Sequence, residues 1–348
     1  MKIAVDAMGG DYAPEQIVKG IELARDANPD ISFQLFGKSD EIKKYLKNQG
    51  NIEIIDTDVV IDMGDEPVKA VRQKRKSSLV LAAQAVKDGK ADAFYSAGST
   101  GAILAAGLFV IGRIKGIDRP GLTTTLPVIN KDGSIGQFLL IDVGANADTK
   151  VLNVYEYALM GRFYAQAIMG IKNPTIGLLN NGTEADKGDM KHREIHDLLL
   201  ENKELNFIGN VESRELLNGA ANVVVTDGFT GNAVLKSIEG TAGSMLNLIK
   251  SSIMSGGLKS KLGALMLKDV FKKIGKNLDY SQYGGAVFLG VKSPVIKSHG
   301  SSKAKTVKFA MDQIKQIVNS KMIPQVNDYL QSHEDEIQAI KDKVKSSK

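Results

Sequence analysis

Short apolar runs alternate with stretches of helical spacing along the first part of the chain. Strand-length runs cover Lys2–Asp6, Ser32–Phe36 and Ile52–Ile55, and apolar residues recur every three or four positions in the intervals at 17–24 and 41–47. Because strands separated by helices pair in parallel, this alternation predicts an open α/β sheet of the doubly wound type.

Similar runs continue through most of the chain. The further predicted strands are Asp92–Tyr95, Thr123–Ile129, Gln137–Val143, Pro174–Leu179, Asn222–Thr226 and Gly284–Val291. The turn sequence Asn130-Lys-Asp-Gly133 predicts that the second and third of these form a hairpin. Helical spacing predicts helices at 68–81, 103–111, 151–169 and 302–323, and the charge-rich last twenty residues are expected to form a frayed helix.

Polar loops follow five of the predicted strands. They span 6–11, 96–102, 142–146, 180–188 and 227–232. Each loop alone is typical of a strand-to-helix turn, where Gly, Asn, Asp, Ser and Thr supply left-handed backbone and helix caps. In a parallel sheet, however, the carboxyl ends of the strands share one edge, where ligands bind. We therefore expect the five loops to line one cleft. The candidate site residues are Asp6, Gly9, Gly10, Ser99, Thr100, Gly101, Asn146, Asn180, Asn181, Glu184, Lys187, Asp227 and Asn232.

The loop Asn180–Gly188 has the composition of an oxyanion site. Asn180 and Asn181 offer neutral hydrogen-bond donors, and Lys187 offers a fixed positive charge. The loop contains no obvious nucleophile. Taken alone it is more typical of a strand-to-helix turn than of a site, so its assignment depends on the other loops.

The segment Ser96–Ala102 joins a predicted strand to a predicted helix. Gly98 and Gly101 allow backbone N–H groups to approach an anion, and Ser99 and Thr100 add hydroxyl groups. The Gly-Lys-Ser/Thr end of a Walker A loop is missing, so a nucleoside triphosphate is not implied. The segment is a candidate cradle for a simple anion.

The histidines do not indicate a metal site. His192 and His196 have i,i+4 spacing, but no Glu follows His192 and no third ligand is evident, so both are predicted to be surface residues. His299 lies in a turn of Gly and Ser, where it can bind phosphate or move a proton. We expect no bound metal.

Two basic stretches are candidates for contact with anionic partners. Arg72–Lys76 contains four cations and suits a phosphate or an acidic protein surface, although a solvated helix end has the same composition. The second stretch belongs to a predicted helical insertion at 233–282 that breaks at Gly256-Gly257. Its predicted contact residues are Leu258, Leu262, Leu265, Met266, Lys268, Lys272 and Lys273. A basic amphipathic helix lies on an anionic membrane or docks an acidic partner; an ordinary surface helix or half of a dimer bundle is the alternative.

Composition limits the class of protein. The 348 residues, 43% of them hydrophobic, suffice for one large domain or two, and we expect a single domain at 1–348. A net charge of +5 does not indicate a nucleic-acid binder. Cysteine is absent, which excludes disulfides and thiolate chemistry. The start of the chain, Met1–Asp6, has no signal-peptide layout, and no apolar run approaches about 18 residues. We expect a soluble, cytoplasmic protein.

The candidate cleft is rich in anion donors but lacks a covalent nucleophile. No Gly-x-Ser-x-Gly elbow and no cysteine is present. This inventory fits a reaction in which an anionic substrate is itself the nucleophile. Hydrogen phosphate attacking an activated carbonyl needs positioning and oxyanion stabilisation more than an enzyme nucleophile.

Six segments together resemble the bacterial phosphate acyltransferases (PlsX). They are Val5–Pro14, Ser96–Ala102, Asp142–Asn146, Asn180–Gly188, Asp227–Asn232 and Gly284–Ser302, and they occur in order over nearly the whole chain. The first and fourth are the most specific. Ser99 stands where Asn is frequent in the family, which keeps a polar group in place, and Ser293-Pro294 stands where Gly is frequent.

The resemblance implies transfer of a fatty acyl group from acyl-carrier protein to inorganic phosphate, giving acyl phosphate for phospholipid synthesis. It also implies a homodimer with a three-layer α/β/α fold, akin to the isopropylmalate dehydrogenases and phosphotransacetylases, and no cofactor. A helical protrusion is expected from the insertion. Family members are cytoplasmic and associate peripherally with the membrane, and contact with the downstream glycerol-3-phosphate acyltransferase is a further expectation.

The implied roles fall into two groups. The residues expected to polarise or orient the thioester carbonyl are Lys187, Asn232, Asn180 and Asn181. The residues expected to hold phosphate are Ser99, Thr100 and His299. Two other classes remain open. One is a dehydrogenase of the related fold, although its metal-carboxylate and nucleotide signatures are missing. The other is a non-catalytic membrane scaffold, which only the amphipathic stretch suggests.

Overall fold

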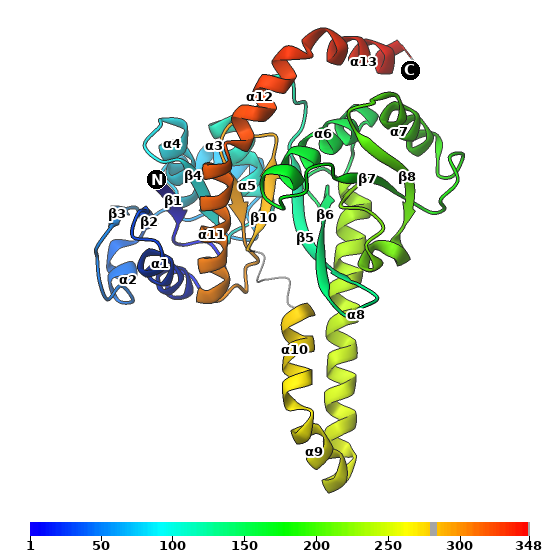
Figure 1. Ribbon diagram of the computed structural model, residues 1–348. Coiled ribbons are helices and arrows are strands. Elements are labelled where there is room, and N and C mark those ends of the chain that lie inside the picture. Colours follow the sequence, from blue (N-terminus) through cyan, green and yellow to red (C-terminus); the bar gives the residue numbers. More distant parts are fainter. Residues whose placement is uncertain (279–283, 347–348) are drawn as a thin grey trace.

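A computed structural model describes residues 1–278 and 284–346, which form a body built on one sheet and a helical projection (Figure 1). The strands are β1 (Lys2–Asp6), β2 (Ser32–Gly37), β3 (Ile52–Asp56), β4 (Ala93–Ser96), β5 (Gly121–Ile129), β6 (Ile135–Ile141), β7 (Thr175–Asn180), β8 (Asn206–Glu212), β9 (Val223–Val225), β10 (Ala286–Leu289) and β11 (Val295–Lys297). The helices are α1 (Glu15–Ala27), α2 (Ser39–Lys43), α3 (Pro67–Gln73), α4 (Ser78–Lys87), α5 (Thr100–Ala106), α6 (Val151–Ala167), α7 (Met190–Glu201), α8 (Gly228–Ser255), α9 (Gly257–Met266), α10 (Lys268–Leu278), α11 (Ala304–Ser320), α12 (Met322–Ser332) and α13 (Glu334–Ser346). A π-helical turn, η1, covers Gly107–Ile111, and a 3-10 turn, η2, covers Ser213–Asn218.

The sheet consists of two parallel halves that run in opposite directions. Its strand order is β3-β2-β1-β4-β11-β10-β5-β6-β9-β7-β8. The first five strands of this order are parallel to one another, and so are the last four. Between the halves, β10 is antiparallel to β11 and β5, and β5 is antiparallel to β6. The prediction of a mostly parallel, doubly wound sheet therefore holds within each half.

This topology contradicts the expectation that five polar loops share one edge. The loops at 6–11 and 96–102 follow β1 and β4, whereas those at 142–146, 180–188 and 227–232 follow β6, β7 and β9. Because the two sets of strands point in opposite directions, their carboxyl ends lie on opposite edges of the sheet. The predicted β5–β6 hairpin is present and contributes to the reversal.

Helices cover both faces of the sheet, as the three-layer prediction required. On one face, α1, α6, α7, α11 and α12 pack in an apolar cluster that includes Val5 and Tyr95. On the other, α3, α4, α5 and the first turns of α8 pack in a cluster that includes Ala4 and Phe94. Neighbouring residues of one strand therefore enter different cores, as the pleat of a strand requires.

The predicted helix over 68–81 is two helices. α3 ends at Gln73, and α4 begins after Ser77, whose hydroxyl accepts a hydrogen bond from the Val80 N–H at 3.4 Å. A serine that caps a free N–H favours a new helix start over continuation. The break brings Ser78, the first residue of α4, against Asp6 at the end of β1.

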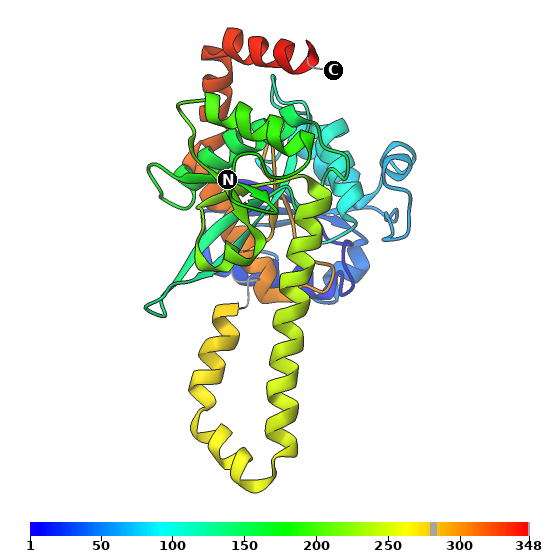
Figure 2. The ribbon, with the colours of Figure 1, turned by 90° about the vertical axis from the view of Figure 1, so that its right-hand side faces the viewer.

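The segment predicted as a helical insertion extends away from the sheet, as Figures 1 and 2 show from two sides. α8 starts on the body and runs outward, and α9 and α10 return beside it. The predicted amphipathic helix is two helices, because α9 ends at Met266 and α10 begins at Lys268. Residues 279–282 of the insertion lie outside the described residues. The expected frayed helix at the carboxy terminus includes α13, whose Ile337 is buried in the core.

Glu156 of α6 gives the fold a predicted pH dependence. Its carboxylate accepts a hydrogen bond from the Asp118 N–H at 2.9 Å, while Oε1 has no partner in the described part of the chain. Burial raises the pKa of Glu156 from 4.5 to about 7, with a further rise from the Asp118 charge and an opposing effect of Lys341. Between these two pH values the unfolded chain loses a proton that the folded chain keeps.

We therefore expect the free energy of unfolding to fall as the pH rises from about 4.5 to 7, by an upper limit of roughly 3 kcal/mol. Glu156→Gln removes the titrating group, so its stability will vary less over this range. Urea unfolding at pH 5 and pH 8 measures the difference, with the exposed Glu336→Gln as the control. An equal pH dependence in wild type and Glu156→Gln would show that this carboxyl is not responsible.

Candidate active site

Asp6 is the buried centre of the loops that follow β1, β4 and β11, here called the first cluster (6–11, 96–102 and 297–301). Its Oδ1 accepts a hydrogen bond from the Ser78 hydroxyl and its Oδ2 one from the Ser96 hydroxyl, both at 2.7 Å. Burial raises the pKa of Asp6 above its usual value, against the lowering effect of these hydrogen bonds. Asp6 therefore holds α4 and β4 together at the edge of the sheet.

Close backbone contacts bring the three loops of the first cluster together. A Cβ on Gly9 would lie 2.8 Å from the amide nitrogen of Gly98, so only glycine fits there. Gly10 has a φ of +105°, and the next N–H, of Asp11, donates to the Gly300 carbonyl at 2.9 Å. Gly9 and Gly10 thus serve the site by permitting close approach.

The predicted phosphate residues lie in this first cluster. Ser99 precedes α5 and is buried, yet its hydroxyl does not cap the helix. Thr100 begins the helix, and Gly101 packs against Pro67 of α3, where a Cβ would come within 2.5 Å. His299 is exposed, and its Nδ1 accepts a hydrogen bond from the Ser301 N–H at 3.2 Å. In the neutral ring the proton is therefore on Nε2, which can donate to an anion.

The loops after β6, β9 and β7 form the second cluster (142–146, 227–232 and 180–188). Asp142 orders its first loop, since its carboxylate accepts hydrogen bonds from the N–H groups of Leu122, Gly144, Ala145 and Asn146 at 2.8 to 3.1 Å. Burial raises the pKa of Asp142 despite these bonds.

Two predicted members of the second cluster have structural contacts. The Asn146 amide donates to the Pro120 carbonyl, the Asp142 carboxylate and the Tyr157 hydroxyl at 2.8 to 2.9 Å. The Asp227 carboxylate caps α8 by accepting from the N–H groups of Phe229 and Thr230. Both were candidate site residues, and in the structure their side chains hold the loop and the helix start.

Asn232 and Lys187 keep their polar groups available. Asn232, near the start of α8, lies beside Gly144. A Cβ added to Gly144 would be 3.4 Å from the side-chain amide carbon of Asn232. Lys187 is exposed on the 180–188 loop. Within residues 1–278 and 284–346, neither side chain forms a hydrogen bond or an ion pair. Both can therefore donate to a ligand without breaking a protein contact.

The backbone of the 180–188 loop is fixed by side-chain amides. Asn180 Nδ2 donates to the Lys187 carbonyl at 3.2 Å, and Asn180 Oδ1 accepts from the Asn181 N–H at 2.8 Å. Asn210 of β8 donates to the Glu184 carbonyl at 2.7 Å. Asn180 thus positions the segment that carries Lys187, while the Asn181 and Glu184 side chains are exposed.

Helix α8 connects the two clusters although they lie on opposite edges. Asn232 in its first turn belongs to the second cluster, and the charge of Glu239 acts on Lys297 of the first. The seven-residue step from Asn232 to Glu239 rises about 10 Å along α8, so this part of the helix is long enough to reach from one cluster to the other. Lys297, the last residue of β11, belongs to the first cluster but was not among the candidate residues, because the run Val295–Lys297 is only three residues long.

The basic run at 72–76 covers the end of α3 and the connection to α4, whose first residue contacts Asp6 of the first cluster. The Arg72 guanidinium lies over the Phe109 ring, 5.6 Å from its centroid. Lys74 pairs with Asp65 at 2.5 Å, and Arg75 donates to the Arg72 carbonyl at 3.2 Å. Several of the predicted anion-binding cations therefore already have partners in the chain.

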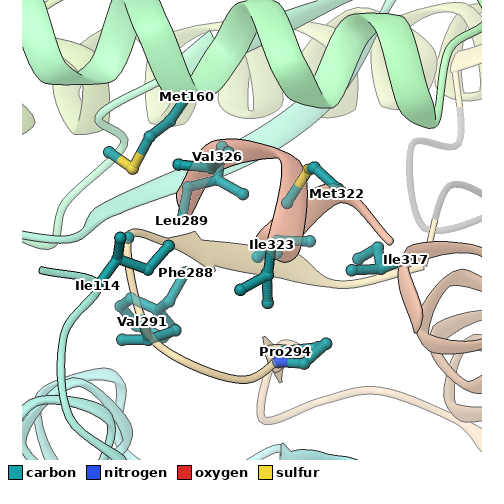
Figure 3. A pocket seen from close by; sticks show the side chains of 12 residues that line it. Ile114, Met160, Phe288, Leu289, Val291, Pro294, Ile317, Met322, Ile323 and Val326 are labelled. Atoms are coloured by element: carbon teal, nitrogen blue, oxygen red, sulfur yellow. The ribbon is translucent and has the colours of Figure 1, made fainter. Parts of the chain in front are cut away.

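An apolar crevice between β10 and α12 is separate from both clusters (Figure 3). Its walls include Ile114, Met160, Phe288, Met322 and Val326. It has room for about 10 Å³, comparable to a single water-sized sphere. The crevice is too small for an acyl chain and contains no charged side chain.

No group of three or more metal-binding side chains occurs among the residues that the structure describes. His192 is bonded to Asp189 at 2.8 Å. His196 was predicted to be a surface residue, but it is buried, with its ring 5.3 Å from that of Phe207. The two histidines lie on one helix, and the apolar face of α7 takes His196 into the core.

Comparison with known proteins identifies the family. A model of the family described as fatty acid synthesis protein matches residues 1–325. The phosphate acyltransferase of Levilactobacillus brevis is 63% identical over 346 residues, which cover 99% of this chain and 100% of the relative. The chain belongs to the phosphate acyltransferase family. The phosphate acyltransferase of Lactiplantibacillus plantarum is 56% identical over 339 residues, 97% of each chain. This protein is therefore an acyltransferase, which decides against the dehydrogenase and scaffold alternatives.

Two solved structures share the acyltransferase's fold. A phosphotransacetylase from Streptococcus pyogenes has a TM-score of 0.58 at 18% identity and covers 93% of this chain and 94% of its own. A branched-chain phosphotransacylase from Enterococcus faecalis has a TM-score of 0.53 at 16% identity, with coverages of 91% and 99%. These similarities establish the architecture alone. Among the described residues, no helix has the length and apolar character to span a membrane.

Proposed function

We propose that this acyltransferase moves a fatty acyl group from acyl-carrier protein to inorganic phosphate, producing acyl phosphate for phospholipid synthesis. The observation that carries the proposal is that α8 joins two clusters of polar side chains. Among the described residues, these clusters offer hydrogen-bond donors that are free to bind anions. The names of the family and of its members support the acyl group and the phosphate acceptor. The absence of cysteine from the chain favours direct attack by phosphate over a thiol-bound intermediate.

The proposed reaction divides the work between the clusters. Ser99, Thr100 and His299 hold phosphate in the first, and Lys187 and Asn232 face the thioester carbonyl in the second. A phosphate oxygen attacks the carbonyl carbon, and the C–S bond breaks as the oxyanion collapses. The carrier leaves as a thiolate that takes a proton from solvent. Preorganised donors at the developing oxyanion lower the barrier for this step. No cofactor takes part.

Release of the carrier's thiol tests this proposal. Because the enzyme has no cysteine, a thiol reagent reports only the carrier. We expect release from acyl-carrier protein that depends on added phosphate, with an acyl phosphate product that hydroxylamine traps. Release that is independent of phosphate would indicate a thioesterase, and no release by the folded enzyme would exclude this donor.

The helical projection is proposed to place the enzyme at the membrane. At its tip, Leu258, Leu265 and Met266 are 76%, 66% and 87% exposed. Lys268, Lys272 and Lys273 follow on α10 and are exposed as well. Apolar side chains beside lysines suit the headgroup region of an anionic bilayer. In this position the enzyme would deliver acyl phosphate to the downstream glycerol-3-phosphate acyltransferase.

A homodimer is proposed from the shaft of the same projection. Met245, Leu248 and Ile249 are exposed in the outer half of α8, before the tip. A second copy of the chain would remove this apolar surface from water, which favours association. The measurement is the mass of the enzyme in solution, which a monomer would contradict.

Replacing Leu258, Leu265 and Met266 together by Ser is expected to lower binding to anionic vesicles by at least about tenfold, because each side chain loses its transfer into the bilayer. Vesicle flotation measures the bound fraction, with the exposed Leu23→Ser on the body as the control. Reversing the charges of Lys268, Lys272 and Lys273 will weaken binding to anionic vesicles. If both variants bind as wild type does, in lipid and in carrier assays, the projection has only a structural role.

A further inference from the structure

Lys297 lies on the same face of the sheet as Asp6 and Ser96. It pairs in register with Ser96 of the neighbouring strand β4, and the Ser96 hydroxyl donates to Asp6 of the next strand at 2.7 Å. Val295 and Phe94, two residues earlier on their strands, belong to one apolar cluster. Because side chains alternate along a strand, Lys297 points to that cluster's side. Three polar side chains therefore form a row across strands spaced about 4.8 Å apart.

The side chain of Lys297 is half-buried, and its ammonium group is unpaired among the described residues. α8 packs over this face through Val234, Leu235 and Ile238. Within the part of the chain that the structure describes, Lys297 has no hydrogen bond and no carboxylate within ion-pair distance. Burial lowers its pKa, and the more distant charge of Glu239 only opposes this effect. Partial burial of an ammonium without a partner costs free energy, so the fold alone does not account for this lysine.

We infer that Lys297 is a phosphate-binding residue, whose ammonium group supplies the positive charge of the first cluster. The other candidates there, Ser99, Thr100 and His299, bring hydroxyl and imidazole donors but no permanent charge. A dianion bound among them would provide the partner that Lys297 lacks. Asp6 in the same row does not take this place, because its two oxygens are engaged by Ser78 and Ser96. The inference rests on the proposed function for the identity of the anion.

Lys297→Gln is expected to raise the KM for phosphate by about 10- to 100-fold, as loss of a hydrogen bond to a charged group does. The KM for the acyl donor should stay within about twofold, and Lys297→Arg should restore part of the phosphate affinity. Lys292→Gln, an exposed lysine five residues earlier, is the matched control and should behave as wild type. Wild-type KM for phosphate in Lys297→Gln would overturn the inference.

A second variant separates binding from folding. Lys297→Met keeps the apolar stem and removes the charge, so its melting temperature should equal or exceed that of wild type while phosphate affinity falls. A lower melting temperature with unchanged phosphate affinity would instead identify a structural lysine.

Calorimetry with inorganic phosphate alone distinguishes failure of this inference from failure of the proposed reaction. If wild type binds phosphate tightly and Lys297→Gln binds it weakly, the inference stands even if no acyl transfer occurs. The ratio of wild-type to Lys297→Gln affinity for phosphate should approach one as the pH rises through the pKa of Lys297, because the ammonium group loses its charge. Glu239, Asp6 and His299 are present in both proteins, so their titration does not change this ratio. If wild type and Lys297→Gln bind phosphate equally, or neither binds it, the inference is wrong.

Discussion

Lys187→Ala is expected to reduce the rate of acyl transfer by about 10²- to 10³-fold, the usual effect of removing an oxyanion donor. The side chain is exposed and has no partner within the described residues, so the fold does not depend on it. The loop that carries it is held by the Asn180 amide, which contacts the Lys187 carbonyl and not its side chain. The measurement is phosphate-dependent thiol release at saturating donor.

The control for this prediction is Lys172→Ala. Lys172 is exposed and precedes β7, at the opposite end of the strand from the 180–188 loop. It carries the same charge but lies away from both clusters, so its removal should leave the rate unchanged. A Lys187→Ala enzyme with full activity would refute the assignment of the second cluster to the thioester.

Gly231→Ala is expected to destabilise the enzyme by at least about 3 kcal/mol. A Cβ at this position would lie 1.9 Å from the Asp142 carbonyl oxygen, which is backbone and cannot turn aside. The first turn of α8 would have to move away from the 142–146 loop and take Asn232 with it. Urea unfolding measures the loss of stability, and the acyl transfer rate should fall with it.

Gly240→Ala is the matched control in the same helix. No atom lies within 4 Å of the added Cβ, so alanine should stabilise α8 by about 0.5–1 kcal/mol through its higher helix propensity. Opposite signs for the two substitutions would confirm that contact with the loop, and not helix propensity, selects glycine at 231. Equal effects would contradict the close packing of α8 on the second cluster.

Strands buried on both faces could be located from the sequence. β1 was predicted at its observed bounds and β7 to within one residue, because such strands are continuous apolar runs with polar ends. β8 and β11 could not be located. β8 (Asn206–Glu212) mixes polar and apolar residues at the edge of the sheet, and β11 has three residues. Neither provides a pattern long enough to distinguish a strand from a loop.

The opposite directions of the two halves were beyond sequence reasoning. The hairpin turn at 130–133 predicted that β5 and β6 are antiparallel, as they are. The other reversal depends on β10, which inserts between β11 and β5 although it lies far later in the chain. Local patterns contain no information about that insertion, so five strand-end loops were placed on one edge when they occupy two.

The composition of the loops located the clusters but could not separate ligand-binding residues from structural ones. Asp227 and Asn146 have the residue types of a site, and the structure uses them as a helix cap and a loop brace. Asp and Asn satisfy backbone groups and ligands with the same atoms. Lys297 was not a candidate, because β11 has only three residues and the helix that packs on this face is distant in the sequence.

The mass of the product formed from phosphate labelled with ¹⁸O at all four oxygens tests direct attack on the thioester. If a phosphate oxygen attacks the carbonyl carbon, acyl phosphate made from acyl-carrier protein will retain all four labelled oxygens. An acyl phosphate with three labelled oxygens would show that its bridging oxygen came from the carboxylate of a free fatty acid. Unlabelled fatty acid as the sole product would show that phosphate is not the acceptor.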